Sequence, residues 1–308
     1  MKIAVPDLIS PSYFPAEAAV ALGFFANEGI DARLELISPI ERAYEALRNG
    51  DIDIVAGSAH SALSAFPRWN GVKLICAQSQ GMYWFLVMRA DLGAKRGDLS
   101  VVKGRRIGAA PWVGLCFRQL LVESGIDPDR DDVKIMPTPG SLNKKVNFGV
   151  AAARALEEGV IDGFWANGMG AEIAVDSGVG TLVLDVRRGD GPKAAFNYTM
   201  ATLATTDKLI AEQPEKIAGA VRAISATQLA LQNDVQLAEK VAAKFFPEDS
   251  SHIVELVRRD LRFYRSDLTH AFVEGMNRFA RAIKILDEDV PYSNIVAERF
   301  SKYWNKSG

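Results

Sequence analysis

One short pattern occurs twice in the chain, 109 positions apart. In each copy a helix is expected to end at a glycine, which adopts the left-handed backbone conformation without steric cost, and an apolar strand is expected to follow. A repeated helix–strand unit predicts two α/β lobes built on the same plan. The first copy comprises Ala46, Leu47, Gly50, Ile52 and Asp53, and the second comprises Ala155, Leu156, Gly159, Ile161 and Asp162.

Small polar residues follow the repeated strand in both copies. The first run is Gly57-Ser58-Ala59-His60-Ser61, and the second is Asn167-Gly168-Met169-Gly170. Small residues at the end of a strand allow backbone amides to approach a ligand closely, and the N-terminus of the next helix carries a partial positive charge. We therefore expect the two runs, one from each lobe, to form a cleft for a small anionic or polar molecule.

The composition limits the class of protein. A chain of 308 residues exceeds the usual size of a single core, which favours two domains. The net charge of −2 argues against nucleic acid or an anionic membrane as the partner. Short basic clusters at Lys103, Arg105-Arg106 and Arg187-Arg188 are interpreted as solvated surface residues. No run of 18 apolar residues is present, so no transmembrane segment is expected.

The N-terminus and the two cysteines give indications of the cellular compartment of the protein. A strand follows Met1 almost at once, without an export signal, so the chain as written is expected to be cytoplasmic, or periplasmic if a signal was removed. Cys76 and Cys116 lie in apolar surroundings and match no metal-binding spacing. We expect two buried free thiols, no metal and no cofactor.

The order of elements predicts two Rossmann-like lobes, each with a largely parallel sheet, joined by two strands that act as a hinge. The linking strands are expected at 83–89 and 197–205. The first lobe would comprise residues 1–86 and 200–308, including a C-terminal helical buttress, and the second lobe residues 87–199.

Two helix starts carry specific signals. Ser38, Pro39 and Glu41 match a capping box, with Ser38 as the N-cap and the proline in the first turn. In the second lobe, a loop is expected at 111–114, before a helix that ends at Gly125.

Four residues stand out as candidates for ligand contacts. Asn167 occupies the position equivalent to Ser58, and its amide is both a donor and an acceptor, although it also suits a helix N-cap. His60 follows Ser58 closely and is either a ligand contact or a hydrogen-bonded structural group. Trp112 is expected to cover a flat ligand, and Arg118 to pair with a carboxylate or sulfonate. Trp84 and Trp165 are interpreted as packing residues.

Three segments carry a resemblance to a known family: residues 14–25 (PheProAlaGluAlaAlaValAlaLeuGlyPhePhe), 50–62 (GlyAspIleAspIleValAlaGlySerAlaHisSerAla) and 158–167 (GluGlyValIleAspGlyPheTrpAlaAsn). The chain resembles the type II periplasmic-binding-protein superfamily. Within it, the chain is most similar to the branch of sulfonate, taurine, nitrate and thiamine-pyrimidine receptors named for the yeast pyrimidine synthase.

The resemblance implies a solute-binding protein that captures a small anion or heteroaromatic molecule between its lobes, as the receptor of an ABC-type importer with a permease as partner. It also implies that residues just past the strand ends hold the ligand. In this chain those residues are Ser10, Tyr13, Ser58, Ala59, His60, Ser61, Trp112, Val113 and Asn167.

Two alternatives remain open on the same scaffold. The synthase members of the branch use a cysteine-rich motif with an active-site lysine and histidine, whereas this chain has only Gly-Leu-Cys-Phe-Arg around Cys116. A lyase or decarboxylase would need an acid and a base, for which His60 with Asp7 or Glu172 are candidates. A cytoplasmic ligand sensor is the other alternative. Because no nucleophile, metal or phosphate-binding motif is present, the sequence favours a binding protein and assigns no catalytic residue.

Overall fold

The computed structural model describes residues 1–8, 10–138, 148–245 and 250–305. The chain forms two compact units. Unit 1 comprises Met1–Gly81 and Thr199–Gly308, and unit 2 comprises Met82–Tyr198. The boundaries expected from the sequence were after residues 86 and 199.

Unit 1 is built on a five-stranded mixed sheet with the order β2-β1-β3-β10-β4. The first three of these strands are parallel, and β10 pairs antiparallel with both β3 and β4. The strands are β1 (Lys2–Val5), β2 (Arg33–Leu36), β3 (Ile54–Ser58), β4 (Val72–Ser79) and β10 (Ala201–Thr206).

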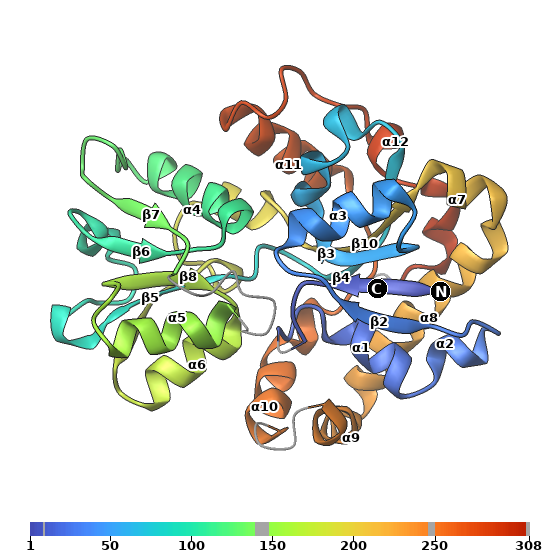
Figure 1. The fold of residues 1–308 in the computed structure, drawn as a ribbon, viewed down its shortest axis with the longest axis horizontal. Helices are drawn as coiled ribbons and strands as arrows, with labels where there is room; N and C mark the ends of the chain where they lie inside the picture. The colour runs from blue at the N-terminus through green and yellow to red at the C-terminus, as the bar shows by residue number, and fades with distance from the viewer. Residues whose placement is uncertain (9, 139–147, 246–249, 306–308) are drawn as a thin grey trace. The chain divides into compact units, whose positions relative to one another are not determined.

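Helices cover both faces of this sheet. Ile3, Val5 and Ile54 of the strands pack with Ala16 of α1 and Ile217 of α8 in one apolar core, while α3 lies on the opposite face (Figure 1). The C-terminal helices belong to unit 1, so the expected buttress of the first lobe is confirmed. The helices are α1 (Phe14–Ala21), α2 (Phe24–Asn27), α3 (Ile40–Asn49), α7 (Asp207–Glu212), α8 (Pro214–Asn233), α9 (Gln236–Phe245), α10 (Ser250–Asp260), α11 (His270–Ala282) and α12 (Tyr292–Ile295).

Unit 2 repeats the plan with a second five-stranded sheet, in the order β7-β6-β8-β5-β9. Ala152 and Leu156 of α5 and Ala174 of α6 pack against Phe85 and Phe164 of the sheet, and α4 covers the other face (Figure 1). The strands are β5 (Phe85–Arg89), β6 (Arg106–Gly108), β7 (Lys134–Met136), β8 (Gly163–Ala166) and β9 (Gly180–Asp185). The helices are α4 (Pro111–Glu123), α5 (Phe148–Glu157) and α6 (Gly168–Asp176).

The two strands expected to link the lobes are instead members of the sheets. β5 lies between β8 and β9 in unit 2, and β10 lies between β3 and β4 in unit 1. The chain passes from one unit to the other at Gly81-Met82 and again at Tyr198-Thr199. The chain therefore crosses just before the predicted 83–89 and inside the predicted 197–205, but the strands β5 and β10 do not span the units, because each completes a sheet within one unit.

The capping box expected at Ser38 does not form. Helix α3 begins at Ile40, and Pro39 occupies the N-cap position with an extended backbone and no side-chain cap. The repeat glycine behaves as predicted, since Gly50 ends α3 in the left-handed conformation with φ of 79°.

The aspartate of the repeat performs the same structural task in both units. In unit 1, Asp53 Oδ2 accepts a hydrogen bond from the backbone N–H of Lys2 at 2.8 Å. In unit 2, Asp162 Oδ2 accepts one from the backbone N–H of Arg106 at 2.9 Å. Each aspartate thus joins the start of its own strand to the start of the neighbouring parallel strand, which explains why the repeat contains it.

Candidate functional site

The sheet topology of unit 1 brings four chain segments to one edge. The carboxyl ends of the parallel strands β1 and β3 lie at this edge. Ala201, the first residue of β10, lies opposite Ser58 of β3 and opposite Ser79 of β4. The residues after Val5, Ser58 and Ser79 and those before Ala201 therefore share the carboxyl edge, where ligands of open α/β sheets bind.

The predicted loop at Ser58 begins a short 3-10 helix, η1 (Ala59–Ser64). The hydroxyls of Ser58 and Ser61 lie 2.6 Å apart and hydrogen-bond to each other, while Tyr44 donates a hydrogen bond to the Ser58 carbonyl at 3.0 Å. A Cβ on Gly57 would lie 2.4 Å from Ile40 Cδ1, so a larger residue here would force the Ile40 side chain of α3 to move. Hydrogen bonds within the loop and from α3 thus fix its conformation.

His60 and Ala59 are tied to the residues that precede β10. The His60 amide donates a hydrogen bond to Thr199 Oγ1 at 3.4 Å, and the Ala59 amide donates to the Met200 carbonyl at 3.0 Å. The His60 ring meets the Phe279 ring edge-on, with 5.6 Å between centroids, and is 1% exposed. The sequence missed Thr199 and Met200 because only strand pairing places them beside His60.

The segment after β1 forms a second tight turn at the same edge. Asp7 Oδ1 accepts a hydrogen bond from the Ser10 amide at 2.7 Å, and the Ser10 carbonyl accepts one from the Tyr13 amide at 3.0 Å. Gln78, from the end of β4, accepts a hydrogen bond from the Ala16 amide at 3.3 Å. Ser10 and Tyr13, both predicted from the resemblance, are buried just before the N-terminus of α1.

In unit 2, strand register again gathers the predicted residues at one edge. Phe85, the first residue of β5, lies opposite Ala166 of β8 and opposite Asp185 of β9. Asn167, the residues before Phe85 and the residues after Asp185 consequently lie at the same edge. The carboxyl end of β6, which pairs parallel with β8, also lies there.

Asn167 is the N-cap of α6. Its side-chain oxygen accepts a hydrogen bond from the Gly170 amide at 3.2 Å. A Cβ on Gly149 of α5 would lie 2.4 Å from the same oxygen, so close helix packing fixes the side chain. The structural interpretation of Asn167 is confirmed, and its contact with a ligand stays a prediction.

Three other unit 2 predictions need comment. Trp112 and Val113 lie in the first turn of α4 and are half-buried, so the loop expected at 111–114 was wrong. Arg118 pairs with the exposed carboxylate of Asp129 on the same unit, and its role in anion binding stays a prediction. Trp165 is fully buried and stacks on Phe117 with 5.2 Å between ring centroids, which confirms it as a packing residue.

Arg187 corrects the interpretation of the basic clusters as solvated. It is 5% exposed, and its guanidinium lies 5.4 Å from the centre of the Tyr83 ring, a cation–π contact. The adjacent Arg188 pairs with Asp185 at 2.8 Å. Arg187 lies two residues after the end of β9, so its place after an apolar strand was the available signal.

Burial limits the reactivity of the two cysteines. Cys76 and Cys116 are not joined in a disulfide and are fully buried, as predicted, and burial raises the pKa of both thiols, which disfavours a thiolate nucleophile. Within the described ranges, no group of three or more histidine, cysteine and acidic side chains is arranged to hold a metal. None of the helices there is both long and apolar enough to cross a bilayer.

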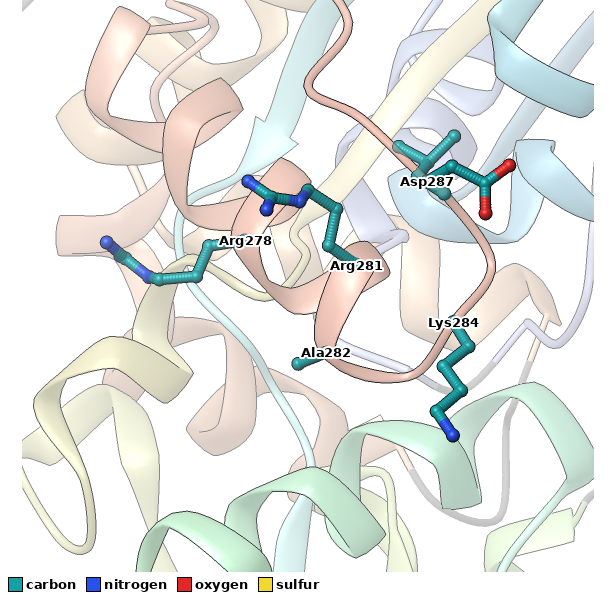
Figure 2. Close-up of a pocket in the computed structure, with 6 residues that line it drawn as sticks. Arg278, Arg281, Ala282, Lys284 and Asp287 are labelled. Atoms are coloured by element: carbon teal, nitrogen blue, oxygen red, sulfur yellow. The ribbon is translucent and has the colours of Figure 1, made fainter.

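A surface cavity of about 560 Å³ lies elsewhere on unit 1, at the end of α11. Arg278, Arg281 and Lys284 line it, but Figure 2 shows these three side chains pointing in different directions, and Arg281 already pairs with Asp289 at 3.3 Å. Its basic side chains are exposed, so the cavity lacks the buried polar groups of a specific small-molecule site.

Solved structures show the same fold at low sequence identity. A protein of Bordetella bronchiseptica RB50 has a TM-score of 0.79 and 18% identity, with 98% of this chain and 95% of that chain covered. The alkanesulfonate-binding protein SsuA of Xanthomonas axonopodis pv. citri, bound to MOPS, has a TM-score of 0.69 and 11% identity over 97% and 96% of the two chains. A variant of the desulfurization enzyme DszB, in complex with biphenyl-2-sulfinic acid, has a TM-score of 0.68 and 14% identity over 98% of each chain.

The family is established by sequence. No curated protein sequence matches the chain. The two mixed α/β sheets, however, have the periplasmic-binding-protein fold of the solved relatives. The NMT1/THI5 like family model matches residues 10–236, most of the chain, and the protein therefore belongs to the NMT1/THI5-like family.

Proposed function

We propose that this protein is the solute-binding component of an ABC-type importer and captures a small anionic or heteroaromatic molecule. The observation that carries the proposal is that equivalent strand-end loops, at Ser58 and at Asn167, lie at the carboxyl edges of two similarly built sheets. The binding of sulfonates by solved relatives of the same fold supports it.

Chain connectivity also supports a ligand shared by the two units. The chain leaves unit 1 after β4 and enters unit 2 before β5, so this passage joins the two carboxyl edges. The return passage at Tyr198-Thr199 reaches β10 at the same edge of unit 1. Both passages of the chain between the units therefore start or end at the carboxyl edge of the unit 1 sheet.

In this role the ligand contacts are Ser10, Tyr13 and the Ser58–Ser61 run from unit 1, and Trp112, Val113 and Asn167 from unit 2. The protein would act in the periplasm, where it would deliver its ligand to a membrane permease. A catalytic alternative receives no support from the two buried thiols.

The proposal is tested first by native mass spectrometry of the purified full chain, which weighs any molecule that co-purifies. Titration calorimetry with the released molecule, or with MOPS, then compares the parent with His60→Ala and Asn167→Ala. Loss of one buried hydrogen bond should weaken binding by about 1–3 kcal/mol. Unchanged affinity in both variants would show that the ligand does not bind at these loops.

The importer role has a separate test. The purified protein should bind detergent-solubilised permease encoded beside its gene, and more strongly when loaded with ligand. Turnover of a bound molecule into a product of different mass would instead support an enzyme.

A further inference from the structure

Glu17 is a buried acid whose carboxyl group the described residues leave unsatisfied. It lies in the first turn of α1 and is 0% exposed. Neither of its carboxyl oxygens has a hydrogen-bond partner among the described residues. Burial of a polar group without a partner is costly, and buried polar groups in folded proteins are nearly always paired. The unsatisfied carboxyl group therefore points to a partner other than the described residues.

Two further hydroxyls near the start of α1 share this property. Ser10 and Ser12 are 2% and 1% exposed, and neither side-chain oxygen has a partner among the described residues. Side chains on a helix lean toward its N-terminus, and the turn that contains both serines directly precedes α1. Asp7, whose carboxylate accepts a hydrogen bond from the Ser10 amide, also acts electrostatically on Glu17.

The charges around Glu17 define the partner that it lacks. Burial raises the pKa of Glu17 well above its usual value, and the negative charge of Asp7 raises it further. Among the charged groups of the described residues, Asp7 is the one that acts on Glu17. The helices α8 and α9 that pack against α1 bury neutral side chains, including Gln228 and Val241. The described part of unit 1 therefore supplies acidic and neutral groups here, and a cation would complement them.

We propose that the ligand carries a cationic nitrogen, a protonated amine or amidine, that binds to the Glu17 carboxylate with Ser10 and Ser12 as further contacts. Such a group supplies the N–H donors that both carboxylate oxygens lack, and its charge offsets that of Asp7. Because a nearby cation favours the ionised form of the acid, Glu17 releases its proton when the ligand binds. The inference rests on the proposed binding function and deepens it by naming a charged group of the ligand.

The experiment uses two pairs of probes that differ in one ammonium group: 2-aminoethanesulfonate against ethanesulfonate, and 3-aminopropanoate against propanoate. Binding to the purified full chain is measured by titration calorimetry at pH 7. The amine of each pair should bind at least 10-fold more tightly, and Glu17→Gln should remove about 10- to 100-fold of that affinity. Repetition in buffers of different ionisation enthalpy should reveal proton release by the parent that Glu17→Gln abolishes.

Glu45→Gln is the matched control, because Glu45 is exposed on α3 of the same unit and its loss removes the same charge. It should leave both the preference for amines and the proton release unchanged. Equal affinity within each pair, no binding of either amine, or a preference that survives Glu17→Gln would overturn the proposal. Tighter binding of the amine-free probes would overturn this inference while still supporting the binding function.

Discussion

The repeated aspartates provide a prediction with an internal control. Asp162 accepts hydrogen bonds from the Arg106 amide at 2.9 Å and from its guanidinium at 3.0 and 3.1 Å. The equivalent Asp53 accepts the corresponding bond from the Lys2 amide at 2.8 Å. We therefore expect Asp162→Asn to destabilise unit 2 more than Asp53→Asn destabilises unit 1.

The magnitude follows from the bonds that each substitution removes. An asparagine retains an oxygen for the backbone amide, so Asp53→Asn should cost less than about 1 kcal/mol. Asp162→Asn also removes charge-assisted bonds to a guanidinium. Because that side chain is 43% exposed, solvent screens part of the interaction, and the cost should be about 1–2 kcal/mol.

The pH dependence separates the charged contribution from the neutral one. Hydrogen bonds from Arg106 and its positive charge hold the pKa of Asp162 below its usual value, although partial burial opposes this effect. A group whose pKa is lowered by folding stabilises the protein above the unfolded value of about 3.9, and this stabilisation is lost as the pH falls through the folded value. The difference between the parent and Asp162→Asn should therefore be full at pH 7 and should shrink below about pH 4.

Native-state hydrogen exchange with mass spectrometry is the suitable assay, since two units need not unfold together. Exchange in β6 reports on Asp162, and exchange in β1 reports on Asp53. Equal effects of the two substitutions at pH 7, or an Asp162→Asn effect that does not change between pH 7 and pH 3, would refute the reasoning.

Three further predictions concern other buried positions. Gly149→Ala should displace the Asn167 side chain, because the new Cβ would lie 2.4 Å from its oxygen; loss of this cap should cost about 1 kcal/mol, measured by chemical denaturation. A maleimide should label Cys76 and Cys116 only after unfolding, since both are fully buried; rapid labelling of the native protein, followed by mass spectrometry, would contradict this. Glu17→Gln should stabilise the ligand-free protein at pH 8: the folded protein keeps the Glu17 proton to a higher pH than the unfolded chain, which releases it above about pH 4.3, so the parent loses stability as the pH rises and the variant does not.

The repeat made the plan of the fold predictable. Glycine at the helix end and apolar residues in the next strand are local signals, and the structure confirms them at Gly50 and β3. The roles of β5 and β10 were not predictable from the same signals. An extended apolar segment has the same local sequence pattern whether it spans two units or completes one sheet. Only long-range strand pairing distinguishes the two cases.

Burial was the other property that local sequence did not reveal. Arg187 follows a strand and carries a charge, which is typical of a solvated residue, yet it is buried over the Tyr83 ring. Glu17 is the charged residue of an alanine-rich segment, and glutamate side chains are usually exposed. Its burial depends on neighbours such as α8 and α9, more than 190 residues away in sequence.

Some polar groups at the strand ends are used by the fold, and others are available to a ligand. The hydroxyls of Ser58 and Ser61 bond to each other, and the Asn167 oxygen caps a helix, so part of the hydrogen-bonding capacity of the repeated positions is used within the protein. Glu17 and Ser12 lie outside the repeat, and their side-chain oxygens have no partner among the described residues. The repeat retains the residues that both lobes need in order to fold. A ligand, in contrast, presents different chemical groups to the two lobes. Selectivity should therefore depend more on unrepeated positions such as Glu17 than on the loops that the repeat identifies.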